Sequence, residues 1–322
     1  MVKQKILVTG GGGYIGSRMC QYLAMQGHRI TALCHNPPYN ELWSSKLEKV
    51  VIGDVTDEGL IKELAQDGYD TVIHLVSLDH HQSNGGAPSV VSRINITPVW
   101  SFLDIFAKHN LGKFIYFSTM QVYGPVGSGS INESNTPNTK SPYGLTHHIG
   151  EIICDYYNRN SEIECITVRL SNSYGAPVFS DNNCWWLVIN DLCKMAFTEK
   201  KIVLQSDGSP LRDFIHGWDV CAAVQAIIET GEHYSVYNVS SGITLSIMEI
   251  AEKVKQAYAK RYKTELQITS QPTAGGKNPE HFKIDNMLIR SIGFEPAWNL
   301  ERGINDLFDF FEKEPLYNKS LL

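Results

Sequence analysis

The stretch VTGGGGYIGS, residues 8–17, decides the fold. Three of its glycines are spaced three residues apart, and they stand between a short apolar run and an amphipathic stretch. Glycine permits a tight turn from strand to helix and lets the backbone approach a pyrophosphate, which the first N–H groups of the helix attract. The segment therefore predicts a dinucleotide-binding turn, although such a turn also forms without a ligand. The predicted cofactor contacts in it are Gly10, Gly13, Tyr14, Ile15 and Gly16.

Short apolar runs alternate with longer amphipathic stretches from this turn to about residue 176. Such alternation is typical of βαβ units, in which helices cover both faces of a parallel sheet. We therefore expect an α/β fold: a doubly wound Rossmann domain over residues 1–176, with a return segment at about 214–240. Residues 177–213 and 241–322 are expected to form a smaller C-terminal α/β substrate-binding region. The expected strands are 5–10, 29–34, 49–55, 71–77, 113–119 and 164–170, and the expected helices include 14–26, 57–67, 89–110, one from near 143, part of 214–231, and 246–261.

Composition argues against several classes of protein. The formal net charge of the 322 residues is -6 and the basic residues are scattered, so we expect no nucleic-acid partner. No apolar run approaches the roughly 18 residues of a membrane-spanning helix, so we expect no membrane partner. Seven cysteines without a C-x-x-C pair indicate reduced thiols in a cytoplasmic protein. Neighbouring His80 and His81 do not share a face, and we predict no metal site.

The second predicted strand ends in LCHN, residues 33–36, where dinucleotide sites usually carry an acidic residue for the adenosine ribose. No carboxylate stands there, and no arginine that would meet a 2′-phosphate. His35 would meet that phosphate weakly, and Arg18 lies in the first turn of the first helix. The pattern favours NAD as the cofactor and leaves NADP open.

A set of ordered motifs covers nearly the whole chain. Together they resemble the extended short-chain dehydrogenase/reductase family, whose members include the NDP-sugar epimerases and dehydratases. The resemblance implies a nicotinamide cofactor and a nucleotide-sugar substrate. Its motifs are TGxxGxxG at 9–16, GDVTD at 53–57, HLVS at 74–77, STMQVYG at 118–124, the tyrosine of SPYGLTHH at 141–148, RLSNSYG at 169–175, RDFIHGWD at 212–219 and YNVSSG at 237–242.

The resemblance assigns further contacts to the cofactor. It implies that Asp54 and Val55 flank the adenine and that Leu75 lies along the cofactor. The residue types leave one alternative open, because Asp54 could instead cap a turn before Thr56.

Two residues are implied to hold the diphosphate of the substrate. Asn172 matches the family asparagine at that position, and Arg212 matches the arginine that reaches phosphate, a task that suits its fork of N–H donors. Alternatively, Asn172 caps a turn and Arg212 pairs with Asp213 or Asp219. A further arginine-rich phosphate contact of the family is missing, and Lys277 is a candidate to replace it.

The segment YGLTHH, residues 143–148, carries the predicted chemistry. In the family, a tyrosine is the acid or base for the sugar hydroxyl and a serine or threonine shares its proton. A lysine four residues after the tyrosine binds the nicotinamide ribose and lowers the pKa of the tyrosine. Thr119 and Tyr143 match, whereas Tyr123 is interpreted as structural. The lysine is replaced by His147.

His147 lies one helical turn after Tyr143, so it can face the same cleft. An unperturbed histidine titrates near pH ~6.5 and is mostly neutral at pH 7, so it supports a tyrosinate less than a lysine does. We expect a slower reaction or a more alkaline optimum. The alternative is that His147 is a bystander, as we expect of His148.

Two residues argue against elimination chemistry. The sugar-nucleotide 4,6-dehydratases follow their threonine with aspartate and glutamate, which exchange the protons that elimination requires. Here Met120 and Gln121 occupy those positions and exchange no protons. The reaction that we still expect is hydride transfer at one carbon of the sugar.

We therefore expect a nicotinamide-dependent dehydrogenase, ketoreductase or epimerase of a nucleotide-linked sugar. The alternative is a cofactor-binding module with little or no turnover that kept the fold and lost the lysine. By resemblance, we also expect a homodimer built through helices near 94–109 and 144–159.

Overall fold

The computed structural model describes residues 2–37, 40–231, 234–272 and 281–317. At its centre lies a seven-stranded sheet in the order β11-β7-β5-β4-β1-β2-β3, in which every pair is parallel. The order reverses between β1 and β4, and ligands of open α/β sheets bind at such a point. The predicted Rossmann fold is confirmed. The strands are β1 (Lys5–Thr9), β2 (Arg29–Cys34), β3 (Lys49–Ile52), β4 (Thr71–His74), β5 (Lys113–Thr119), β7 (Glu164–Leu170) and β11 (Val236–Val239).

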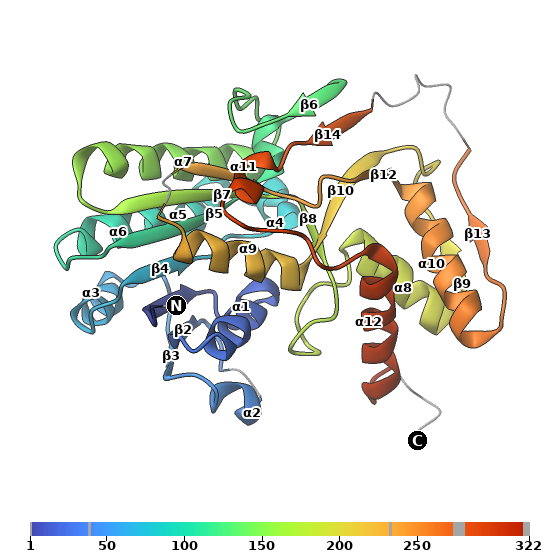
Figure 1. Cartoon of the computed structure of the whole chain (residues 1–322), viewed down its shortest axis with the longest axis horizontal. Helices are drawn as coiled ribbons and strands as arrows, with labels where there is room; N and C mark the ends of the chain where they lie inside the picture. Colours follow the sequence, from blue (N-terminus) through green and yellow to red (C-terminus); the bar gives the residue numbers. More distant parts are fainter. Residues whose placement is uncertain (1, 38–39, 232–233, 273–280, 318–322) are drawn as a thin grey trace.

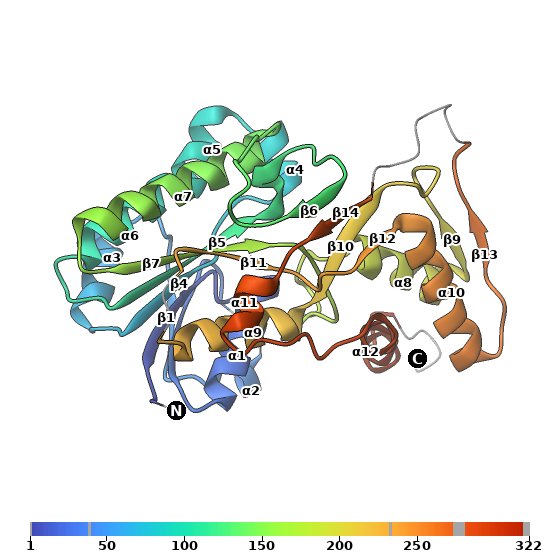
Figure 2. The ribbon, with the colours of Figure 1, turned by 45° about the horizontal axis from the view of Figure 1, so that its top comes forward.

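Helices cover both faces of this sheet (Figures 1 and 2). One face carries α1 (Tyr14–Met25) and α9 (Gly217–Glu229), which pack against each other. The other face carries α3 (Glu58–Gln66), α6 (Thr97–Phe106) and α7 (Pro142–Asn160). Short helices α2 (Glu41–Ser44), α4 (His80–Gly85) and α5 (Pro88–Asn95) occupy connections between strands.

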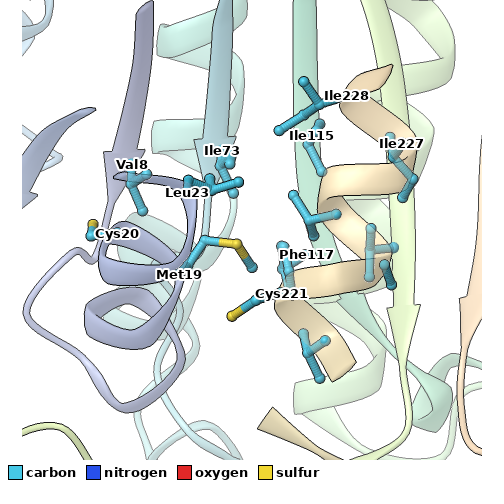
Figure 3. Close-up of a cluster of buried hydrophobic side chains, with 14 of the residues drawn as sticks. Val8, Met19, Cys20, Leu23, Ile73, Ile115, Phe117, Cys221, Ile227 and Ile228 are labelled. Atoms are coloured by element: carbon cyan, nitrogen blue, oxygen red, sulfur yellow. The ribbon is translucent and has the colours of Figure 1, made fainter. Parts of the chain in front are cut away.

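The core under α1 and α9 shows why the parallel strands are apolar along their whole length. Val8 and Ile73 from β1 and β4 meet Met19 of α1, while Ile115 of β5 meets Ile227 of α9, and all are fully buried (Figure 3). A strand buried on both faces needs apolar side chains in both directions, and a second core fills the opposite face.

A smaller region adjoins the sheet (Figure 1). Its core lies between three helices and a three-stranded sheet in the order β12-β10-β8. Two strand pairs, β9 with β13 and β6 with β14, complete the architecture. The elements of the chain outside the large sheet and its helices are β6 (Gly129–Ile131), β8 (Asn172–Tyr174), α8 (Val188–Glu199), β9 (Lys201–Val203), β10 (Leu211–His216), β12 (Thr244–Ser246), α10 (Ile247–Tyr262), β13 (Gln267–Thr269), β14 (Phe282–Ile284) and α12 (Leu300–Lys313), while α11 (Met287–Ser291) packs against β11.

The structure divides the late segments differently from the sequence-based expectation. Within 214–240, α9 and β11 do rejoin the large domain, whereas β10 pairs with β8 and β12. Ile289 and Phe294, expected in the smaller region, pack into the core of the large domain. The division into two domains remains our proposal, with residues 287–294 reassigned.

The helix expected over 89–110 is broken, so that prediction is corrected. The helix α5 ends at Asn95 and α6 begins at Thr97, with Ile96 between them at φ −113° and ψ −55°. Pro98 explains the break, because it donates no N–H to the carbonyl of Ile94 and its ring crowds that carbonyl. Strands β3 and β4 also stop short of the predicted residues 55 and 77, and these freed residues line the cavity described next.

Candidate active site

A cavity of about 490 Å³ opens at the carboxyl ends of β1 to β4. It lies beside the glycine turn, at the point where the strand order reverses. Main-chain segments after all four strands contribute to its wall. Six predicted cofactor contacts are among the lining residues, namely Gly10, Gly13, His35, Asp54, Val55 and Leu75.

The glycine turn has the close packing that a dinucleotide site requires. Gly10 has φ +69°, a left-handed conformation that favours glycine. A methyl group on Gly16 would overlap the carbonyl oxygen of Gly10, so helix α1 can start this close to the turn only without a side chain there. The chain therefore fits a nicotinamide dinucleotide here, with main-chain N–H groups of the turn facing the pyrophosphate.

The side chains of the first helical turn face away from this cavity. The hydroxyl of Tyr14 donates to the Gly175 carbonyl at 2.9 Å, and Ile15 packs against the apolar core. Only the main chain of these two residues is left for the cofactor contact that we predicted. Arg18 is buried with 1% exposure and donates to the carbonyl of Ala176, so it does not meet a 2′-phosphate at the ribose.

Asp54 caps the turn before Thr56 and also lines the cavity in which we expect the cofactor. Its Oδ1 accepts hydrogen bonds from the N–H of Thr56 at 2.8 Å and from its hydroxyl at 2.9 Å, and the residue also lines the cavity. The bond from the Thr56 N–H, assisted by the nearby His35, lowers the pKa of Asp54. An ionised carboxylate in this cavity opposes a 2′-phosphate and favours NAD.

A segment from the second half of the chain contacts the glycine turn. The Asn182 side chain donates from Nδ2 to the Gly12 carbonyl at 3.0 Å, and we call this contact the clasp. Close by, the Phe179 ring stacks edge-on against Trp43, with centroids 5.2 Å apart. The clasp joins residues 170 positions apart in the sequence.

A second cavity, of about 820 Å³, lies between the end of β5, the start of α7 and strand β10. Thr119, Asn172 and Arg212 line it, together with Met120 and Gln121. The structure thus brings the predicted catalytic threonine and the predicted diphosphate contacts into one space. Lys277 lies outside the described residues.

The two diphosphate candidates are held differently. Asn172 donates from Nδ2 to the carbonyl of Asp213 at 2.8 Å. Arg212 donates to the carbonyl of Leu211 at 2.7 Å, and burial lowers its pKa. The suggested partners of Arg212 are engaged elsewhere: the Asp213 carboxylate binds Ser241, and that of Asp219 accepts two main-chain N–H groups. The guanidinium therefore remains available to the cavity.

Tyr143 joins the two cavities. Thr119, which lines the second cavity, and Ser77, which lines the first, both favour the ionised form of the Tyr143 hydroxyl by hydrogen bonding. Burial raises the pKa of Tyr143 to about 12, against the lowering effect of these two bonds, and the Asp79 carboxylate raises it further. The phenol is therefore protonated at neutral pH.

His147 lies on the next turn of α7 and is buried with 3% exposure. Its ring stands edge-on to that of Tyr143, with centroids 4.5 Å apart, and its Nδ1 is 3.3 Å from the Tyr116 hydroxyl. Burial lowers its pKa to about 4, although Glu151 and the main chain of Phe117 act in the opposite direction. Its Nε2 is buried without a partner in the described structure. The expected loss of positive charge is thus more complete than an unperturbed histidine suggests.

Comparison with known proteins identifies the family. The model of the NAD dependent epimerase/dehydratase family matches residues 6–240. This chain belongs to that family. The resemblance inferred from the motifs is confirmed, and with it the class of cofactor.

Individual relatives cover nearly the whole chain. The low-salt glycan biosynthesis protein Agl12 of Haloferax volcanii is 26% identical over 314 residues, 95% of this chain and 98% of that protein. UDP-glucuronic acid 4-epimerase of Bacillus cereus, crystallised with UDP-glucuronic acid and NAD, superposes with a TM-score of 0.78 at 25% identity over 95% of this chain and 98% of that one. UDP-glucose 4-epimerase of Thermotoga maritima, crystallised with UDP-glucose, has a TM-score of 0.82 at 21% identity over 96% and 99% of the two chains.

In this member of the family, a buried ion pair fixes the helix that carries Tyr143. Arg169 of β7 donates to both carboxylate oxygens of Glu151, at 3.0 and 2.8 Å, and the Ser118 hydroxyl donates to the same carboxylate at 2.5 Å. His148 approaches it at 3.5 Å, so its role is structural, as expected. Because Glu151 is already paired with Arg169, its charge is too compensated to keep His147 protonated.

Tyr123 has the structural role that we expected of it. Its hydroxyl donates to Oδ1 of Asn238 at 2.7 Å and accepts from Arg169 at 2.9 Å, which ties η1 (Met120–Tyr123), a 3₁₀ helix, to strands β7 and β11. Among the described residues, no group of three or more His, Cys, Asp or Glu side chains could hold a metal ion. No helix in the same part of the chain is long and apolar enough to cross a membrane.

Sequence reasoning assigned no individual role to three residues of the site, although the segment 77–89 was expected to overhang the nicotinamide. Ser77 reaches Tyr143, while His80 and Lys140 line the second cavity. For Lys140 there was a signal, since it directly precedes the SPYG segment. The contribution of His80 depends on how α4 folds against α7, which no local pattern reveals.

Proposed function

We propose that this chain binds NAD and oxidises one ring hydroxyl of a nucleotide-linked sugar by hydride transfer, with Tyr143 as the base and Thr119 as its partner. One observation carries the proposal: the Tyr143 hydroxyl bonds to residues of both cavities. Bound NAD supplies a hydride acceptor at C4 of the nicotinamide. The membership of the chain in an NAD-dependent family, and the UDP-sugar complexes of its structural relatives, support this assignment.

The residues of this chain have separate tasks in the reaction. Main-chain N–H groups of the glycine turn hold the pyrophosphate, and Asp54, Val55 and Leu75 hold the adenosine half. In the second cavity, Asn172 and Arg212 bind the diphosphate of the substrate. This directs the sugar toward Thr119 and Tyr143.

The proton of the sugar hydroxyl passes to Tyr143. The phenol must be ionised to accept it, and with a pKa near 12 it is ionised rarely at neutral pH. The hydrogen bond donated by Thr119 stabilises the phenolate, because donors to a charged oxygen favour its charged form. The neutral His147 adds no charge, and its buried Nε2, which has no partner in the described structure, is the atom that we assign to a ribose hydroxyl of the cofactor.

A substrate panel tests the proposal. Purified protein is denatured and the released nucleotides are identified, and native protein is then mixed with UDP-glucose or UDP-glucuronic acid. We expect released NAD(H), and either reduced nicotinamide absorbance or an epimerised sugar by chromatography. Absence of bound or binding NAD, together with no change in either sugar, would contradict the proposal.

One observation favours the alternative of a binding module without turnover, namely the neutral and buried His147. Such a module would bind NAD and UDP-sugars calorimetrically yet show no hydride transfer in a single-turnover mixture at any pH from neutral to alkaline. The Arg212 guanidinium argues against it, because it lines the second cavity while the acidic partners suggested for it bond elsewhere, which leaves it for a substrate.

We also propose a homodimer through α6 and α7. Large apolar side chains are exposed there, including Trp100 at 57%, Ile152 at 53% and Tyr156 at 52%. A second copy of the same face would cover them, and a two-fold axis makes such a face self-complementary. Light scattering at micromolar concentration should give twice the chain mass, and a monomer would refute the proposal.

A cytoplasmic location is our proposal as well. All seven cysteines are free and buried, as expected of a protein kept in a reducing compartment. Fractionation of cells that express the tagged protein tests this, and recovery from the periplasm or medium would contradict it.

A further inference from the structure

The second cavity contains one imidazole that the proposed reaction does not use. His80, the first residue of α4, lines the same space as Thr119. Its ring stands edge-on to that of Tyr143, with centroids 6.2 Å apart and an interplanar angle of 88°. It is therefore close to the place where the sugar must lie, if the proposed function holds.

The hydrogen bonds of Asn84 determine which nitrogen of His80 carries the proton. The main-chain N–H of Tyr143 can only donate, and it donates to Oδ1 of Asn84 at 3.3 Å. The other amide atom, Nδ2, is a donor and lies 2.9 Å from Nδ1 of His80. Nδ1 must therefore accept, and in the neutral ring the proton is on Nε2.

The rest of α4 fixes this geometry. Asp79 caps the helix: its carboxylate accepts from the N–H of Gln82 at 2.8 Å, and the Gln82 side chain accepts from the N–H of Asp79 at 3.3 Å. Asn84 bonds both to His80 and to the main chain of Tyr143, so it sets the distance between them. With Nδ1 occupied, the ring edge that bears Nε2–H is the part left to face the cavity.

The neighbouring histidine differs in each of these respects. His81 is exposed, does not line the cavity, and packs edge-on against Trp186 with centroids 5.4 Å apart. It belongs to the same helix and has the same chemistry, and its ring also lies edge-on to that of His80 with centroids 5.2 Å apart. Its replacement is therefore a control for the loss of packing around His80 without the loss of the His80 donor.

We propose that His80 is a sugar-contacting, specificity-determining residue, which donates a hydrogen bond from Nε2 to an oxygen of the sugar next to the hydroxyl that Tyr143 deprotonates. The cavity around it supports this role. Met120 beside Thr119 donates nothing, and His80 adds a donor from α4 to those of Gln121 and Lys140 in the same cavity. This inference rests on the proposed function.

Two substitutions of His80 separate a sugar contact from a structural role. In His80→Asn, the amide oxygen lies as many bonds from Cα as Nδ1 does, so the Asn84 contact survives and the donor to the cavity is lost. In His80→Gln, the amide nitrogen lies as many bonds from Cα as Nε2 does, so the donor survives and the Asn84 contact is lost. His81→Asn is the control.

The variants are compared by calorimetric binding of UDP, UDP-glucose and UDP-glucuronic acid, and by kcat and KM for the sugar that turns over. We expect His80→Asn to bind the UDP-sugar about tenfold to hundredfold more weakly, since the sugar oxygen loses its donor in a desolvated site. We expect binding of UDP alone to be unchanged, and KM to rise more than kcat falls. His80→Gln should retain most of the affinity for the sugar, and His81→Asn all of it.

The inference is overturned if His80→Asn binds the UDP-sugars like the unsubstituted protein, or if His80→Gln loses as much as His80→Asn. It is also overturned if the substitution weakens the binding of UDP alone as much as the binding of the UDP-sugars. The proposed function fails separately, when the unsubstituted protein binds a UDP-sugar without turning it over. In that case, the calorimetric comparison still decides the role of His80.

Discussion

The cofactor cavity and the group formed by Tyr143, Thr119 and His147, which we call the corner, are built on different principles. The cavity depends on main-chain geometry, that is, the left-handed Gly10 and the close contact between Gly10 and Gly16. The corner depends on side-chain chemistry, and there His147 stands where the family has a lysine. Both regions belong to one sheet-based domain and both lack a charged side chain usual in such sites, but only at Tyr143 does the missing charge bear on proton transfer.

The difference teaches which part of such a site tolerates substitution. A main-chain turn needs only that certain positions lack a side chain, so we expect it to bind the cofactor even though no carboxylate follows β2 and His35 lines the cavity there instead. Proton transfer instead depends on the free energy of a charged oxygen, which each neighbouring group shifts. The corner should therefore be the more sensitive of the two regions to single changes.

The largest expected effect is that of Tyr143→Phe. It removes the oxygen that bonds to Thr119 and Ser77 while keeping the ring, so hydride transfer should fall by about 10²–10⁴-fold with cofactor affinity nearly unchanged. Reduction of bound NAD in a single turnover is the measurement. Tyr156→Phe, an exposed site on the same helix, is the control. A Phe variant with undiminished turnover would show that the proton moves elsewhere.

Gly16→Ala tests the main-chain geometry of the cofactor cavity. Alanine is the better helix former by about 1 kcal/mol, yet here its methyl group meets the carbonyl of Gly10, so the turn must shift. We expect NAD affinity to fall by about tenfold or more, at a cost in stability of about 1–3 kcal/mol. Gly231→Ala, where the added methyl group meets nothing within 4 Å, should change neither. Equal NAD affinities for the two variants would disprove the role of close packing.

His147→Lys sharpens the comparison by restoring the charge. A cation one turn from Tyr143 lowers the pKa of the phenol, and a lowering of one unit gives about ten times more phenolate at pH 7. We expect the single-turnover rate at pH 7 to rise about tenfold and the pH profile to shift to lower pH. His147→Gln, which stays neutral, should keep the profile in place. If both variants match the unsubstituted protein in rate, profile and NAD affinity, His147 is a bystander.

The smallest effect concerns stability. The pKa of His147 is about 6.5 in the unfolded chain and about 4 in the folded one, so its contribution is fully present above pH 6.5 and is lost as pH falls toward 4. Between pH 6.5 and 5 this amounts to a loss of about 1.5 kcal/mol in the free energy of unfolding. In denaturant titrations, the free energy of unfolding of His147→Gln should fall less between pH 6.5 and 5 than that of the unsubstituted protein, by the same amount. An identical drop would mean that the imidazole is solvated.

Much of the fold could be predicted from the sequence, because the apolar runs that became β1, β2, β5 and β7 are local signals. The break at Ile96 was also signalled, by Pro98, but the longer apolar periodicity concealed it. The neutrality of His147 could be predicted only in part. Its extent depends on burial beside Tyr116, whose ring lies so close to α7 that a methyl group on Gly150 would overlap it. A contact between a strand and a helix far along the chain leaves no local pattern.

The clasp between Asn182 and Gly12 has a consequence for the life of the cofactor. The Asn182 side chain holds the main chain of the turn on which a dinucleotide would sit, so we expect exchange of the cofactor to be slow compared with a catalytic cycle. An enzyme that seldom exchanges its nicotinamide has to regenerate it in place, by returning the hydride to the sugar from which it came. Retention of this kind suits a closed redox cycle with no net oxidation, in which the sugar is the only reactant that enters and leaves.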